Sequence, residues 1–235
     1  MSHTDIVSFT YTFIFADGKQ ASFEVRLNSA TGATSRPWPQ KLPNWTKLEN
    51  HQCSHCPLSA KEHLHCPAAV SVLDIVEFFH ETSSIEPVEV SVRSEERTTV
   101  KENVPLPAAV AAVMGARFAG SGCPITAKFQ PMVRYHVPFT TMDEATYRIV
   151  TMHALVQFLR MSEGQQADWS FNDLNRLCQD MNRLNIDFVQ RLRELQVNDA
   201  TTNALTNLDS FVQMVDITVD EDFLAELKQL CRAHF

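Results

Sequence analysis

The sequence predicts an α+β protein, in which a small antiparallel sheet with one helix is followed by a helical bundle. Runs of β-branched and aromatic residues occupy parts of residues 1–105, and helical periodicity replaces them in residues 106–235. Between these runs lies a stretch that is dense in cysteine and histidine. The change of pattern predicts a boundary between residues 105 and 106. The two parts could be separate units or belong to one integrated domain. A metal site is predicted where they meet.

The first two predicted strands form a hairpin. Residues 6–15 (IVSFTYTFIF) and 20–27 (QASFEVRL) alternate large apolar side chains with smaller or polar ones. Asp17-Gly18 lies between them and is typical of a tight turn. Residues 28–50 contain three prolines and little periodicity, which predicts a long loop.

One helix and two further strands complete the predicted sheet region. The run after Cys66 begins with Pro67, a favoured first helical residue, and continues with helical spacing through residue 80. Residues 87–93 and 96–104 alternate as strands. The order β-β-loop-α-β-β favours an antiparallel sheet with a helix on one face.

The second part of the chain is predicted to be helical, with an irregular connector at residues 124–142. A run of small residues predicts a helix over Ala108–Phe118, and Asp143–Met161 is predicted to form another. Apolar spacing predicts helices over Ser170–Leu195 and Asp199–Val215, and a last helix capped by Thr218 and Glu221. Ser170 with Asp173 resembles a capping box. The apolar stripe of the helix starting there predicts packing on the 199–215 helix of the same chain.

The cysteine-rich stretch HQCSHCPLSAKEHLHCP, residues 51–67, holds three of the six cysteines. Cys53 and Cys56 have the C-x2-C spacing that lets one turn present two thiolates to one ion. Cys66 follows, and Cys123 lies in GSGCP. Proline comes directly after the last three of these cysteines, which stops the chain from continuing as regular structure. We expect the four side chains to converge as metal ligands.

The identity of the metal stays open at this point. Four thiolates suit tetrahedral zinc, and the same set suits a four-iron iron–sulfur cluster. The spacing is also compatible with a metal-free loop of reduced, buried cysteines and with a redox-active C-x2-C pair.

Histidines in and near the stretch are further candidates. His51, His55, His63 and His65 could each replace a thiolate. His136, in RYHVPF, could substitute for a cysteine or donate a hydrogen bond to a ligand.

Composition excludes several classes of function. The formal charge of −8 and the absence of a basic stripe argue against nucleic acid as a partner. No segment is long and apolar enough to suggest a membrane span. Residues 6–16 lack the positive flank of a signal peptide, so we expect a cytoplasmic protein with reduced cysteines rather than disulfides.

No phosphate-binding loop, G-x-S-x-G or H-E-x-x-H occurs in the chain. We therefore expect a non-enzymatic metal-binding protein, whose four-cysteine centre ties the α+β region to a helical interaction region. The helical half would bind a protein partner or a second copy. An iron–sulfur redox or sensor protein and an enzyme with an open metal position are the competing hypotheses.

The motifs HQCSHCPL, HCPAA, GSGCP and RYHVPF together resemble an uncharacterised family of bacterial proteins, over roughly residues 45–160. The resemblance implies a cytoplasmic bacterial protein with a cysteine cluster. It implies no catalytic residue and does not distinguish zinc from an iron–sulfur cluster.

Overall fold

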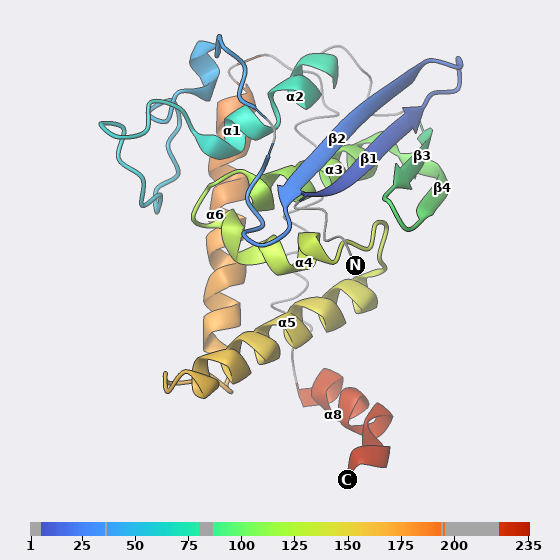
Figure 1. Cartoon of the computed structure of the whole chain (residues 1–235), viewed down its shortest axis with the longest axis vertical. Helices are drawn as coiled ribbons and strands as arrows, with labels where there is room; N and C mark the ends of the chain where they lie inside the picture. Colours follow the sequence, from blue (N-terminus) through green and yellow to red (C-terminus); the bar gives the residue numbers. More distant parts are fainter. Residues whose placement is uncertain (1–5, 36, 80–86, 194, 196–220) are drawn as a thin grey trace.

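The computed structural model of the chain describes residues 6–35, 37–79, 87–193, 195 and 221–235. Its sheet is antiparallel and has the strand order β2-β1-β3-β4 (Figure 1). The strands are β1 (Ile6–Ile14), β2 (Gln20–Asn28), β3 (Pro87–Arg93) and β4 (Thr98–Pro105). All four strands were predicted from the sequence, and their positions are confirmed to within two residues.

Alternation along the strands decides which face of the sheet is buried. In β2 the burial pattern alternates strictly between exposed and buried, as expected for a strand with one face on the core. In β1, Tyr11 and Phe13 are completely buried. The side chains of β4 are mostly exposed, and the charged Lys101 and Glu102 on this edge strand oppose pairing with another sheet.

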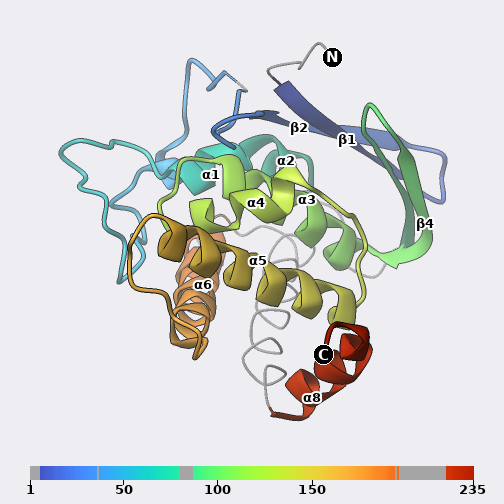
Figure 2. The ribbon, with the colours of Figure 1, turned by 60° about the horizontal axis from the view of Figure 1, so that its bottom comes forward.

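Several helices follow or interrupt the sheet. They are α1 (Pro67–Ser71), α2 (Leu73–Phe79), α3 (Leu106–Gly120), α4 (Gln130–Arg134), α5 (Met142–Ser162), α6 (Asn172–Arg193) and α8 (Glu221–Leu230), with short 3-10 turns η1 (Asn44–Thr46), η2 (Thr126–Phe129) and η3 (Arg232–His234). Viewed from below, the sheet and α3 form layers above α5 and α6 (Figure 2). The predicted helix at 199–215 lies outside the described residues.

Two expectations for these segments were wrong. The helix expected from Pro67 to residue 80 is divided into α1 and α2 at Val72. Arg117 donates a hydrogen bond of 2.9 Å to the carbonyl of Ser71, an acceptor that a continuous helix would use itself. The connector expected to be irregular contains η2 and α4, and Pro131 stands in the first turn of α4, where its missing N–H costs nothing.

The helix α3 is central to the core. It contacts β2, β3 and β4 on one side and α1, α4 and η2 on others. Its end approaches the sheet closely, because a Cβ atom at Gly120 would lie 2.3 Å from Cδ2 of Leu27. The core cluster continues through Phe118, whose ring meets that of Phe188 on α6 at 5.1 Å.

The predicted boundary between residues 105 and 106, which would divide the chain into two units, stays a prediction.

We expect Gly120→Ala to lower the free energy of unfolding by about 1–3 kcal/mol, because the new methyl group overlaps Leu27 in a packed core. Chemical denaturation measures the change. Gly18→Ala is the control, since nothing lies within 4 Å of that position and only its positive φ of 82° adds strain. If Gly120→Ala lowered the free energy of unfolding no more than Gly18→Ala does, the close packing of α3 on β2 would be contradicted.

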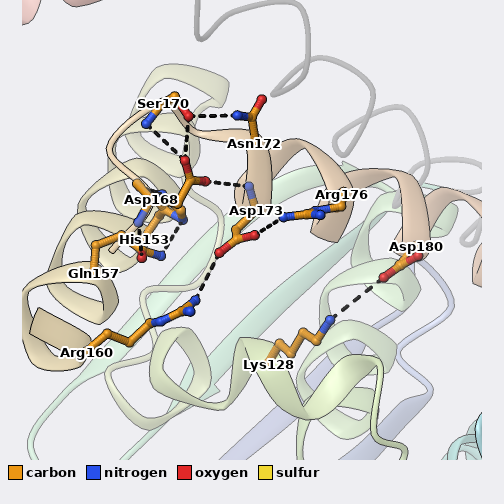
Figure 3. Close-up of polar contacts among 10 residues, drawn as sticks. All are labelled: Lys128, His153, Gln157, Arg160, Asp168, Ser170, Asn172, Asp173, Arg176 and Asp180. Carbon is orange, nitrogen blue, oxygen red and sulfur yellow. Dashed lines mark hydrogen bonds and ion pairs between the residues drawn. The ribbon is translucent and has the colours of Figure 1, made fainter. Parts of the chain in front are cut away.

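The start of α6 is held by a carboxylate rather than by the predicted capping box. Asp168 accepts hydrogen bonds from the backbone N–H groups of Asp173, at 2.6 Å, and Ser170, at 3.1 Å (Figure 3). The hydroxyl of Ser170 donates to the same carboxylate at 2.6 Å. Ser170 was therefore wrongly identified as the cap, because a sequence pattern alone does not show which neighbouring oxygen reaches the free N–H groups.

Replacing Asp168 with alanine should lower the melting temperature at pH 7, with a smaller loss for Ser170→Ala. The N–H groups and hydroxyl around it hold the pKa of Asp168 below its usual range. A lowered pKa gives stability that is complete above the ordinary carboxyl pKa of about 4 and is lost as the pH falls through the folded value. The difference in melting temperature between the wild type and Asp168→Ala should therefore become smaller in acid. Thermal melts from pH 7 to pH 3 measure it. If Ser170→Ala lowered the melting temperature more than Asp168→Ala, Ser170 would be the helix cap, as the sequence predicted.

Among the described helices, none combines the length and the apolar character needed to cross a membrane.

Candidate functional site

The loop between β2 and α1 carries the cysteine-rich stretch and is tied back on itself at several points. The N–H of Cys56 donates to the carbonyl of Cys53 at 2.9 Å, which closes the expected C-x2-C turn. The N–H of Cys66 donates to the carbonyl of Thr46 at 2.7 Å. This second bond fixes the end of the loop against its beginning, so Cys66 enters α1 beside η1.

Cys123 follows α3 and meets this loop from the other side. Gly122 has a φ of +94°, a left-handed conformation that favours glycine, and a Cβ there would lie 3.9 Å from Cβ of Pro67. The N–H of Cys123 donates to the hydroxyl of Ser121 at 3.1 Å. The two Cys-Pro segments, at residues 66–67 and 123–124, are therefore neighbours although they are far apart in the sequence.

The electrostatics of Cys53 report the same proximity. The pKa of its thiol is raised to about 12, mainly by burial and then, in decreasing order, by the charges of Cys66, Asp187, Cys123 and Cys56. All four predicted ligand cysteines thus lie in one electrostatic environment, where ionised sulfurs would repel one another.

Cys66 has a raised pKa for the same main reason, burial of its sulfur. Arg191 opposes the shift most strongly, and the N–H groups of Ala69 and Ala68 oppose it further, whereas Cys123 reinforces it. Neither N–H group makes a regular capping bond to the Cys66 side chain.

The cysteines are neighbours but do not surround a single point as bound ligands do. None of the six forms a disulfide, and Cys53 and Cys56 are half-buried whereas Cys66 and Cys123 are buried. Within the described ranges, no three His, Cys, Asp or Glu side chains have an arrangement that could hold a metal ion. The structure thus brings the predicted residues into one region without forming a coordination sphere.

An arginine from α6 holds the cysteine-rich loop, and sequence reasoning missed it. The side chain of Arg191 is only 1% exposed. Its Nη1 donates to the carbonyl oxygens of Trp45, at 2.8 Å, and Lys47, at 2.6 Å. Its Nη2 donates to those of Leu48, at 3.3 Å, and His51, at 3.1 Å. One guanidinium therefore binds the backbone on the approach to Cys53.

Two further contacts join α6 to the C-x2-C turn. The carboxylate of Asp187 accepts a hydrogen bond of 2.9 Å from the N–H of Ser54. His55 bonds through Nε2 to the carbonyl of Asp180 at 2.9 Å, and a carbonyl can only accept, so His55 donates. His55 therefore contacts α6 in this structure.

The candidate histidines have different surroundings. His51 is exposed, with a φ of 49°, and contributes its carbonyl to Arg191. Thr46 donates its hydroxyl to the carbonyl of Pro43 at 2.8 Å, so it accepts from Nδ1 of His65 at 2.7 Å. That assignment leaves Nε2 of His65 with a lone pair that could accept a hydrogen bond or bind a metal. His63 is exposed.

His136 lies against the sheet rather than the cysteines. Its Nε2 makes a short hydrogen bond to the hydroxyl of Tyr11, and its ring meets that of Phe9 at 5.1 Å. Burial, followed by the charges of Arg148 and Arg97, lowers the pKa of His136 to about 4. No contact among the described residues joins it to a cysteine, and its proposed role at the metal therefore receives no structural support.

The remaining two cysteines were expected to pack in the core. Cys178 is buried on α6, which confirms this expectation, whereas Cys231 is exposed after α8, so the expectation was wrong for this residue.

The sequence model of one protein family, described as a domain of unknown function (DUF6901), matches residues 9–232. The chain belongs to the DUF6901 family. The match begins in β1 and ends in η3, so the DUF6901 domain includes the sheet, the cysteine-rich loop and the helices. No curated protein and no solved structure matches the chain. That other DUF6901 members share the cysteine motifs stays a prediction.

Proposed function

We propose that this chain is a non-enzymatic metal-binding protein in which Cys53, Cys56, Cys66 and Cys123 hold one zinc ion. The ion would fasten the cysteine-rich loop and α1 to the end of α3, at the junction between the α+β region and the helical half. Its role would be to cross-link segments that are distant in the sequence.

The main support is the geometry that brings the four cysteines together. The N–H of Cys56 donates to the carbonyl of Cys53, and a Cβ at Gly122, beside Cys123, would lie 3.9 Å from Cβ of Pro67, beside Cys66. In agreement with this geometry, the neighbouring cysteines raise the pKa of Cys53, and Cys123 raises that of Cys66. Thiolates that crowd together are unfavourable alone, and a divalent cation reverses that repulsion by binding the ionised form. The donor set itself, four sulfurs, is the one that structural zinc uses.

The charge around the cluster also suits such a centre. Four thiolates and one Zn²⁺ carry a net charge of −2, so a nearby cation stabilises the complex. Arg191 is close enough to Cys66 to lower its pKa against the effect of burial. Because its guanidinium is delocalised and always charged, it can remain ionised in this buried position.

Four cysteine ligands would complete a tetrahedral shell and leave no position for a substrate, which is why the proposal is structural rather than catalytic. The helical half would then supply the surface for a partner or a second copy. Leu155, Phe158 and Leu159 of α5 are each at least half exposed, and apolar side chains gathered on one helix are typical of such surfaces.

Metal analysis of the full chain, purified without oxygen, tests the proposal. We expect about one zinc per chain and no iron or labile sulfide. Serine at Cys53, Cys56, Cys66 or Cys123 should each lower the zinc content. For Cys66→Ser the melting temperature should also fall, by less than in a zinc-dependent peptide, because this chain has a core of its own.

Cys231→Ser is the matched control, since this exposed cysteine lies outside the cluster and should leave zinc content and melting unchanged. Iron and sulfide in equal amounts would instead favour the iron–sulfur protein. Zinc that survives all four substitutions, or a protein that binds neither metal, would refute the proposal.

A further inference from the structure

A mostly apolar cavity of about 420 Å³ opens between the sheet region and the helical half, away from the cysteines. Small residues of α3 form one wall, among them Ala108, Ala112 and Ala116, and the segment from η2 to the start of α5 forms the opposite wall. Its volume lies in the range of small-molecule sites, which are largely apolar with a few polar groups.

The polar lining of this cavity has one sign of charge. The cations Lys101 and Arg148 and the neutral ring of His136 line it, and no acidic residue is among the described side chains that do so. Burial lowers the pKa of Arg148, and the charge of Arg97 lowers it further. Glu144 acts in the opposite direction, but its carboxylate also accepts the N–H of Thr141 at the start of α5. Arg148 is therefore close to another cation, Arg97, and an anion bound in the cavity would reduce the repulsion between them.

Arg148 has donors to offer such an anion. Its Nη2 bonds to the carbonyls of Met132 and Tyr135, each at 3.0 Å. No described residue accepts a hydrogen bond from its Nη1 or Nε. Two parallel N–H groups of a guanidinium match the two oxygens of a carboxylate.

His136 offers a further donor through its tautomer. The hydroxyl of Tyr11 is completely buried, and burial raises its pKa, so it keeps its proton. It has no other partner among the described residues, and donation to Nε2 of His136 satisfies it. The neutral ring then carries its hydrogen on Nδ1, and that N–H is available on a residue that lines the cavity.

From this combination we infer that the cavity binds an amphipathic carboxylate, such as a medium-chain fatty acid. The alkyl chain would lie along the small residues of α3, and the carboxylate would meet Arg148 and Lys101. An uncharged lipid would leave the basic groups without a counterion. This inference is independent of the proposed zinc centre, because no cysteine lines the cavity.

Calorimetric titration of the full chain with dodecanoate, below its micellar concentration, tests the inference. We expect saturable binding of one dodecanoate per chain, and binding of dodecanol that is at least about tenfold weaker, since a charge-assisted hydrogen bond is lost. Failure of dodecanoate to bind, or equal affinity for dodecanol, would overturn it.

Variants locate the site. Arg148→Met should weaken dodecanoate binding by about tenfold or more and leave dodecanol binding nearly unchanged. Arg183→Met is the matched control, because Arg183 is exposed on α6 and does not line the cavity. Equal effects of the two substitutions would overturn the role of Arg148. If Arg148→Met does not fold, Lys101→Met on the exposed edge strand replaces it in this test. It should likewise weaken the binding of dodecanoate and leave that of dodecanol nearly unchanged.

Filling the cavity gives a second readout. Ala112→Leu should abolish binding of both ligands, whereas Ala112→Ser, which keeps the volume, should retain it. Circular dichroism confirms that both variants are folded. Unchanged dodecanoate affinity in a folded Ala112→Leu protein would show that the ligand binds elsewhere and would overturn the inference.

Discussion

Replacing Arg191 with methionine should lower the free energy of unfolding by about 3 kcal/mol or more. The substitution removes the donor of four hydrogen bonds to the carbonyls of Trp45, Lys47, Leu48 and His51. Acceptors that lose a buried partner cost about 1–3 kcal/mol each, although water that enters the site offsets part of the sum. Methionine keeps most of the apolar length, so the loss measures the guanidinium rather than the packing.

Denaturant unfolding at fixed zinc concentration measures this change, and Arg193→Met is the matched control. Arg193 lies two residues further along α6 and is exposed, so its substitution should change stability by less than about 0.5 kcal/mol. If both variants were equally stable, the hydrogen bonds from α6 to the loop would contribute little to the fold. If Arg191→Met also released zinc, the loop that carries Cys53 would depend on this arginine.

The strands could be predicted because their signal is local. Alternation in β1 and β2 and the Asp17-Gly18 turn determine a hairpin from neighbouring residues alone. The same is true of α6, whose apolar stripe repeats along the whole helix. The helix α3 was predicted from its run of small, helix-forming residues, which is also a local signal. In the fold, local patterns failed where a distant side chain intervened, as Arg117 does at the carbonyl of Ser71.

The candidate site illustrates the same limit. Spacing and the Cys-Pro steps indicated which cysteines to consider, and the structure brings Cys53, Cys56, Cys66 and Cys123 into one environment. The contact of Arg191 with Trp45 spans 146 residues, and no periodicity encodes it. The sequence offered one signal, the position of Arg191 directly before Leu192 and three residues after Phe188, at the edge of the apolar stripe. An arginine that this stripe carries into the core needs partners, because arginine is rarely buried without them.

His136 was considered only as an addition to the metal site, because proximity in a motif was the sole guide. Its neighbours, Tyr11 and Phe9, belong to β1 and are at least 125 residues away in the sequence. Only the folded chain shows that the connector segment returns to the sheet and lines an apolar cavity with it.

A buried polar residue interrupts the apolar stripe of α6. Asn185 follows Leu184 on this helix and is 1% exposed. Neither atom of its side-chain amide has a hydrogen-bond partner among the described residues. An amide buried in this way costs free energy, so this position is a weak point of the stripe.

Met181→Asp tests how the stripe of α6 is buried. Met181 is 8% exposed within a single chain, which agrees with the expectation that the stripe packs intramolecularly. The predicted contact with the 199–215 helix lies outside the described residues. A carboxylate at this position would be buried without a partner, so we expect a loss of about 3 kcal/mol or more in the free energy of unfolding.

Ile186→Asp is the control for this substitution, because Ile186 lies on the same helix and is 52% exposed. It should leave stability nearly unchanged, so the contrast isolates burial from the effect of an added charge on α6. Thermal melts combined with sedimentation decide the outcome. If Met181→Asp instead gave a stable, folded monomer where the parent was a dimer, the stripe would be an interface between chains, and its intramolecular assignment would be wrong.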